Sequence, residues 1–133
     1  ASFQNFSFHF DSAAGIIYTV DVTKPKGEKI TIISMADGTP FSMDKMYKVA
    51  LNSYRGNGGG ELLTKGAGIP QDELKGRILF STDKDLRYYL MQYIEKKGVI
   101  EPHALGQWKF IPEEWVEPAA KRDYEYLFGK VEK

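Results

Sequence analysis

The sequence has no cysteine, only two histidines among its 133 residues, and no surplus of charge of either sign. Without cysteine there can be no disulfide, no thiolate metal ligand and no cysteine nucleophile, although the cellular compartment stays open. The 18 Lys and Arg residues balance 18 Asp and Glu residues, so no basic surface is predicted to bind nucleic acid. No apolar run approaches the ~20 residues that a membrane-spanning helix needs, so no membrane span is predicted.

The remaining composition is that of an ordinary folded domain, with 42% hydrophobic and 27% charged residues. A chain of this length can bury roughly two thirds of its unfolded surface in one core. We therefore predict a single domain over residues 1–133. The first residues have neither the basic nor the apolar segment of a signal peptide, and there is no initiator methionine, so we expect an excised piece of a larger protein.

Apolar and polar residues alternate repeatedly in the first half of the chain. This period of two is typical of half-buried strands, and short breaks with proline, glycine or aspartate separate the runs. The pattern predicts an antiparallel β-meander. Its predicted strands are residues 6–10, 16–22, 29–35 and 46–52.

The second half changes to a helical pattern. Thr82 and Asp85 resemble a capping box, and apolar residues then recur at i, i+3, i+4, i+7 and i+8, which predicts an amphipathic helix ending near Gly98. The tyrosines of this helix are expected in the core and at its rim; they are Tyr88, Tyr89 and Tyr93. Shorter elements are predicted as a helix over residues 70–74, a strand over residues 77–80, a tryptophan-containing segment over residues 108–118 that packs on the core, and a last helix over residues 122–133. The fold class is α+β.

Four glycines occupy five positions directly after the last predicted strand, within residues 56–60. Glycine loses more backbone entropy on folding than other residues, so such a loop indicates positive φ angles or a close approach of the backbone. A phosphate-binding P-loop is excluded because Gly60 is followed by Glu61 rather than by Lys and Ser or Thr. The dinucleotide fingerprint fails because its third glycine would fall on Glu61.

An aromatic residue and three polar residues flank this loop: Tyr54 with Asn52, Arg55 and Asn57. A ring beside exposed backbone groups can stack a planar heterocycle and bind its edge. The alternative is a tight loop with Tyr54 in the core, and the residues alone leave both readings open. Arg55 could guide a phosphate, pair with an acidic neighbour or face the solvent.

Two segments resemble the C-terminal domain of the 5′-nucleotidase family, which includes bacterial 2′,3′-cyclic-nucleotide 2′-phosphodiesterases. The first segment is residues 10–21, with Lys24 and Pro25 after it, and the second is residues 47–54 with the glycine loop. The resemblance covers nearly the whole chain. It implies a domain that clamps the base of a nucleoside or nucleotide between two aromatic rings, one from each segment. By position these rings are Phe10 and Tyr54.

The resemblance also implies the rest of the substrate site. Asn52 and Asn57 could bind the base edge or the ribose, beside the loop backbone. Gly60 stands where many members carry an Asp that can bind ribose hydroxyls, so ribose recognition is lost or passes to Glu61. The predicted substrate-binding residues are Phe10, Asn52, Tyr54, Arg55, Asn57, Gly58, Gly59 and Gly60.

Catalysis is expected outside this chain. The resemblance places two divalent metal ions on an N-terminal metallophosphoesterase domain of the same polypeptide, whereas His9 and His103 here belong to no metal-ligand motif. We therefore predict no catalytic residue, metal ligand or cofactor in this chain, and no activity for it alone. By the resemblance the complete protein is periplasmic or extracellular. Two alternatives remain, a stand-alone nucleoside-binding module without catalysis and a purely structural domain.

Overall fold

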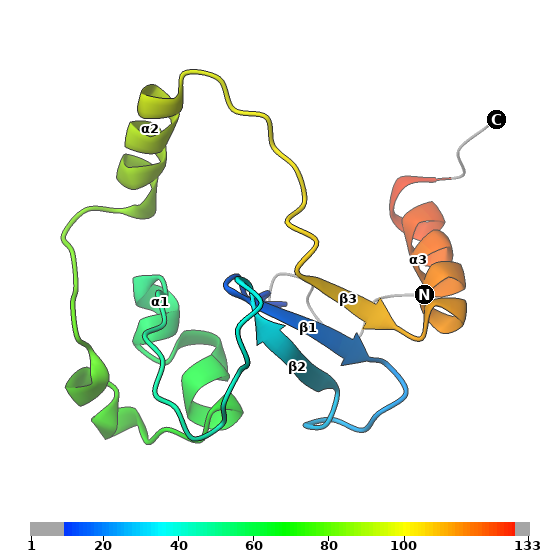
Figure 1. Cartoon of the computed structure of the whole chain (residues 1–133), viewed down its shortest axis with the longest axis horizontal. Coiled ribbons are helices and arrows are strands. Elements are labelled where there is room, and N and C mark those ends of the chain that lie inside the picture. The colour runs from blue at the N-terminus through cyan, green and yellow to red at the C-terminus, as the bar shows by residue number, and fades with distance from the viewer. Residues whose placement is uncertain (1–9, 130–133) are drawn as a thin grey trace. The chain divides into compact units, whose positions relative to one another are not determined.

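The computed structural model describes residues 10–129, and their contacts group them into two compact units. The first unit comprises Phe10 and Met46–His103, and the second comprises Asp11–Lys45 with residues 104–129. Figure 1 labels the main helices and strands of both units. The prediction of a single domain over residues 1–133 stays a prediction.

The second unit is built on a three-stranded mixed sheet in the order β2-β1-β3. β1 (Ile16–Asp21) pairs antiparallel with β2 (Ile30–Met35) and parallel with β3 (Trp108–Ile111), as Figure 1 shows. The core of this sheet is Tyr18, which is only 5% exposed and stacks on Trp108 with 6.0 Å between ring centroids. Trp108 in turn meets Phe110 edge to face at 5.1 Å. The sheet and the helices together confirm the α+β class.

The predicted meander is wrong in its connectivity. β1 and β2 form as predicted, and Gly38 with φ 84° makes the turn that follows β2. Residues 46–52, however, have no regular secondary structure. The second edge of β1 is filled instead by β3, which is part of the tryptophan-containing segment that we expected to pack on the core without a predicted strand. The first predicted strand, residues 6–10, lies outside the described residues except for Phe10, which is in no strand.

The last helix starts earlier than predicted. α3 (Glu113–Phe128) follows Pro112 directly and includes Pro118, so the predicted range of residues 122–133 is wrong at its start. Two glutamates in its first turn interact favourably with the helix dipole. One of them, Glu113, pairs with Lys109 of β3 at 2.8 Å. Both partners are more than 60% exposed, so this ion pair contributes little to stability. Residues 130–133 lie outside the described part of the chain.

The first unit consists of short helices and turns. Among its described residues the buried ones are Leu74, 5% exposed, and Arg55, 7% exposed. The predicted helix over residues 70–74 is a single 3-10 turn. The strand predicted over residues 77–80 is wrong, because Arg77 ends a second 3-10 turn and residues 78–80 are in no strand. The elements are α1 (Ser53–Gly56), η2 (Gly59–Glu61), η3 (Leu62–Gly66), η4 (Gln71–Glu73), η5 (Lys75–Arg77) and α2 (Leu86–Lys97).

The amphipathic helix is confirmed as α2, but its cap differs from the prediction. Asp85 is the N-cap, and its Oδ1 accepts a hydrogen bond from the backbone N–H of Tyr88 at 2.9 Å. Thr82 lies further upstream and its hydroxyl contacts the Tyr89 hydroxyl at 2.7 Å. Gly98 ends the helix with φ 74°, as predicted.

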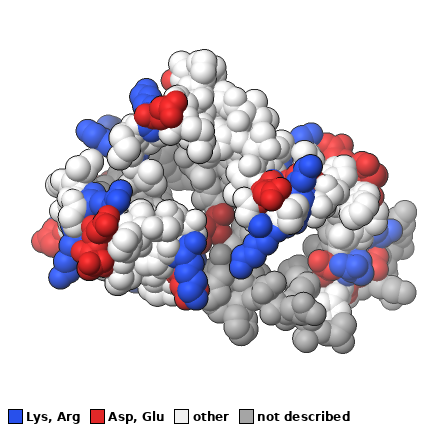
Figure 2. All heavy atoms as spheres, turned by 90° about the horizontal axis from the view of Figure 1, so that it is seen from below, with Lys and Arg blue, Asp and Glu red and all other residues white. Residues whose placement is uncertain are grey.

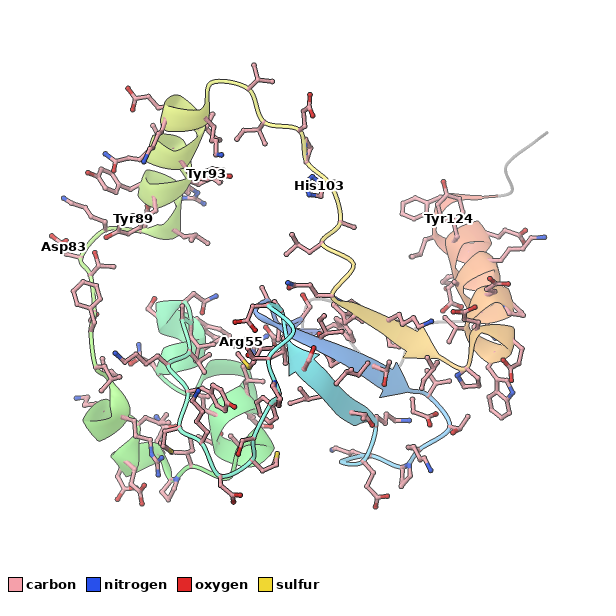
Figure 3. The ribbon with its side chains drawn as sticks, viewed as in Figure 1. Arg55, Asp83, Tyr89, Tyr93, His103 and Tyr124 are labelled. Carbon is pink, nitrogen blue, oxygen red and sulfur yellow. The ribbon has the colours of Figure 1, made fainter. Side chains whose placement is uncertain are left out.

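The tyrosines of α2 are not in a core. In Figure 3, Tyr89 and Tyr93 project from this helix, and their exposed fractions are 45% and 54%. Tyr88 is 42% exposed, and every other residue of α2 is exposed as well. The expectation of core and rim positions for these residues is therefore wrong.

None of the helices formed by residues 10–129 is long and apolar enough to cross a membrane.

The charges are balanced locally as well as in total. On the face shown in Figure 2, Lys and Arg side chains lie interspersed with Asp and Glu side chains. Four ion pairs of 2.6–2.9 Å are found among the described residues, and three of them join residues four apart in the sequence. The predicted lack of a nucleic-acid partner stays a prediction.

The cap of α2 gives a first prediction. Asp85→Ala removes the side chain that accepts from Tyr88 N–H, so it is expected to destabilise α2 by about 1 kcal/mol. Thr82→Ala is expected to cost less, because Thr82 is not the N-cap. Amide hydrogen exchange of α2 measures both effects. A larger effect of Thr82→Ala would contradict this assignment of the cap.

The turn after β2 gives a second prediction. The hydroxyl of Thr39 donates to Asp37 Oδ1 at 2.7 Å and its N–H donates to the same atom at 2.9 Å, and both bonds lower the pKa of Asp37. A lowered pKa in the folded chain means that this stabilisation is present above the usual pKa and is lost as the pH falls through the lowered value. Thr39→Val removes the stronger of the two causes and should raise the pKa of Asp37 toward its usual value.

Carboxyl-carbon NMR titration measures this pKa directly. Thr31→Val, on the exposed side of β2, is the matched control and should leave the titration of Asp37 unchanged. An unchanged Asp37 pKa in Thr39→Val would show that the hydroxyl is not its cause.

Candidate functional site

The glycine-rich segment begins with a helix that Asn52 caps. The Asn52 side-chain oxygen accepts from the N–H of Arg55 at 2.8 Å, which fixes the first turn of α1. The amide nitrogen Nδ2 is therefore the atom with which Asn52 could donate to a ligand. At the other end, the Asn57 N–H donates to Ser53 O at 2.9 Å, and the Asn57 side chain belongs to an exposed residue.

Gln71 ties this loop to the next turn of the chain. Its Nε2 donates to Asn57 O at 3.1 Å, and a Cβ atom at Gly58 would overlap its amide group, which would have to shift. Gly58 itself has φ 91°, which only glycine adopts readily. Sequence reasoning did not find Gln71, because a lone glutamine 14 residues away carries no local signal of this contact.

The next two glycines allow side chains to approach the loop backbone. A Cβ atom on Gly59 would lie 2.6 Å from ring carbons and from the carbonyl oxygen of Tyr54. A Cβ atom on Gly60 would overlap Arg55 Nη1 and lie 2.9 Å from its Cζ, and Gly60 also has φ 66°. Positive φ angles and a close approach, the two features that the glycine run predicts, are both present.

Arg55 lies inside the loop rather than in solvent. Its guanidinium Nη1 donates to Gly59 O at 3.1 Å, and its Cζ lies 5.4 Å from the centre of the Tyr54 ring. Figure 3 labels this side chain on α1. At 7% exposure the solvent-facing alternative does not hold. A direct contact of Arg55 with a ligand phosphate stays a prediction.

The two predicted stacking residues are both exposed. Tyr54 is 59% exposed and Phe10 is 52% exposed. The reading that places Tyr54 in the core is therefore wrong, and each ring has surface that a ligand could cover. That the two rings face one another across a slot stays a prediction.

Glu61 has a conformation of its own at the end of the loop. It is the one described residue other than glycine with a positive φ, at 60°, and its carboxylate pairs with Lys65 at 2.6 Å. The Glu61 side chain is 60% exposed, so the pair is weak and the carboxylate stays accessible. Its suggested contact with ribose stays a prediction.

A pocket of about 420 Å³ lies within the second unit, beside the first of the two resembling segments. Gln107 Oε1 accepts a hydrogen bond from the N–H of Gly15 at 3.3 Å. This bond connects the first resembling segment to the residue that directly precedes β3. No local pattern predicts this contact, because the two residues are 92 positions apart in the chain. The pocket is lined by Ser12, Ala13, Ala14, Ala104, Leu105, Gly106, Gln107 and Trp108.

The described residues offer no ligand set for a metal ion. Across residues 10–129, no three His, Asp or Glu side chains gather in an arrangement that could bind one. His103 is exposed, and its Nδ1 lies 3.1 Å from Glu101 O. The two divalent ions that the resemblance implies do not fit these residues, and their place in another domain stays a prediction.

Comparison with known proteins identifies the family. Residues 3–65 match the family model described as the 5′-nucleotidase, C-terminal domain. Over 121 residues the chain is 31% identical to the trifunctional nucleotide phosphoesterase protein YfkN of Bacillus subtilis (strain 168). This match covers 82% of this chain and 8% of that protein. No solved structure matches. Residues 3–65 belong to the 5′-nucleotidase C-terminal domain family, and the chain spans about 8% of the length of this relative.

The packing of the loop gives a third prediction. Gly59→Ala places a methyl group against the Tyr54 ring and carbonyl, so it is expected to destabilise the protein by roughly 1–3 kcal/mol and to shift the Tyr54 resonances. Gly56→Ala is the matched control, because a Cβ atom there meets nothing within 4 Å and φ is not positive. Denaturant unfolding and NMR measure both variants. Equal stability of the two would refute the close approach at Gly59.

Proposed function

We propose that this chain is the base-binding part of a nucleotide phosphoesterase and holds the base between Phe10 and Tyr54. The observation that supports this most is the Tyr54 ring, which lies within the family-matched residues, is 59% exposed and adjoins the glycine loop. Phe10 is also within the matched residues and half exposed. Stacking of an aromatic side chain on a base contributes ~1–3 kcal/mol and tolerates different bases.

The polar groups around Tyr54 would add direction to this stacking. Asn52 can donate from Nδ2 while its oxygen caps α1, and the Asn57 side chain is on an exposed residue of the same loop. The backbone groups of the three successive loop glycines, Gly58, Gly59 and Gly60, complete the proposed surface. Arg55 would support the loop that forms this surface, since its guanidinium donates to Gly59 O.

Hydrolysis is assigned to a different part of the same polypeptide. The matched relative is a nucleotide phosphoesterase of which this chain covers only 8%. We expect an N-terminal metallophosphoesterase domain with two divalent metal ions, which generate hydroxide and neutralise the phosphoryl oxygens. This arrangement would act outside the cytoplasm, in the periplasm or the extracellular space. The choice among 5′-, 3′- and cyclic esters would belong to that domain.

Removal of one ring tests the clamp. Tyr54→Ala in the complete enzyme should raise KM for a nucleotide, and the affinity for adenosine should fall by roughly 5- to 150-fold, the equivalent of one stacking contact. Isothermal titration with adenosine and steady-state kinetics measure the two effects.

Tyr93→Ala is the control for the loss of an exposed tyrosine, since Tyr93 is 54% exposed on α2. It should leave adenosine affinity unchanged. Wild-type KM and affinity in Tyr54→Ala would remove Tyr54 from the site. Loss of affinity without any hydrolysis by the complete protein would instead favour the stand-alone nucleoside-binding module.

A further inference from the structure

We infer that Arg55 is a positioning residue that orients the Tyr54 ring and excludes every side chain larger than hydrogen from position 60. The inference rests on the proposed function only where it concerns ligand affinity. The coupling between Arg55 and Gly60 is a property of the fold and can be tested without a ligand.

The first step is the position of the guanidinium. Arg55 is 7% exposed, and burial of a charged side chain is unfavourable unless its N–H groups find partners. Nη1 donates to Gly59 O at 3.1 Å, and no buried side-chain nitrogen or oxygen among the described residues is without a partner. The guanidinium is therefore a fixed part of the loop, not a mobile surface charge.

The second step is the space at position 60. A Cβ atom on Gly60 would overlap Nη1 of Arg55, and Arg55 Cζ would lie only 2.9 Å from it. Because Arg55 is anchored at its backbone by Asn52 and at its tip by Gly59 O, it cannot easily move aside. Arg55 and Gly60 thus form a complementary pair in which the large residue requires the small one.

The third step concerns Tyr54. The Arg55 Cζ lies 5.4 Å from the centre of the Tyr54 ring, within the range of a cation–π contact, and the ring also abuts Gly59. One guanidinium therefore connects the ring to the loop backbone. A lysine would keep the charge but not the planar group that contacts both, and a leucine would keep neither the charge nor the hydrogen bond.

This pair has a consequence for specificity. At position 60 the loop can present only its backbone groups to a ligand, because no side chain fits there. An acidic or polar side chain at this position is excluded as long as Arg55 fills the space. The ligand part that lies beside position 60 would thus be bound by N–H and C=O groups of the loop or by the neighbouring Glu61, whose carboxylate is exposed.

A double-mutant cycle in the complete protein tests the coupling. Gly60→Ala, Arg55→Leu and the double variant are compared by thermal unfolding, with Gly68→Ala as the matched control. Gly68 has φ 68°, close to the 66° of Gly60, but a Cβ atom there meets nothing within 4 Å. Gly68→Ala therefore measures the cost of the positive φ alone.

In the wild-type background, Gly60→Ala should lower the Tm of the transition in which this domain unfolds by about 2–8 °C more than Gly68→Ala, because it adds a steric clash. In the Arg55→Leu background the two alanine substitutions should lower Tm equally. Equal losses already in the wild-type background, or an unchanged difference in the Arg55→Leu background, would overturn the coupling. If Arg55→Leu does not fold, the same cycle with Arg55→Met decides, since methionine is too short to place an atom where Cζ and Nη1 lie.

Adenosine titration tests the positioning of Tyr54. Arg55→Leu should weaken adenosine binding at least 3-fold, and its effect should largely disappear when Tyr54 is already alanine. Unchanged affinity in Arg55→Leu, while Tyr54→Ala still weakens binding, would overturn the positioning role and leave the clamp intact. If Tyr54→Ala has no effect on affinity, the clamp fails, and the unfolding cycle alone then judges the Arg55–Gly60 pair.

Discussion

The buried guanidinium of Arg55 is the constraint around which the candidate site is arranged. It is held by a carbonyl of the loop that surrounds it, and the loop can surround it only because residues 59 and 60 lack side chains. A run of four glycines is entropically unfavourable, yet here three of them are explained by close contacts within the chain. The loop backbone is thus packed against the Arg55 side chain before any ligand binds.

Local features of the sequence were predictable where the cause is local. The alternation over residues 16–22 and 29–35 identifies β1 and β2, and the recurrence of apolar residues identifies α2, because side-chain period follows directly from backbone geometry. The cap of α2 was misassigned by one turn, since Thr82 and Asp85 are both good caps and only the backbone decides between them. The exposure of its tyrosines could not be foreseen either, because an apolar face says nothing about what covers it.

Features that depend on distant partners were not predictable. Residues 46–52 have strand-like composition, but β1 pairs at that edge with β3, and no local pattern distinguishes a strand from an unpaired extended segment. Within the site, the resemblance supplied Phe10 and Tyr54, and their exposure fits that role. The position of Arg55 could not be read from its neighbours, since an arginine in a glycine-rich loop is usually solvated.

The family match ends at residue 65, yet the matched residues do not form their sheet alone. β1 obtains its second neighbour from β3, Tyr18 is buried against Trp108, and the Gly15 N–H is bound by Gln107. Each of these partners lies more than 40 residues after the end of the match. Because a two-stranded hairpin is at best marginally stable in water, residues 104–111 are needed to hold the first of the two resembling segments in place. A substitution at Trp108 would therefore act on the fold of that segment even though Trp108 is outside the matched region.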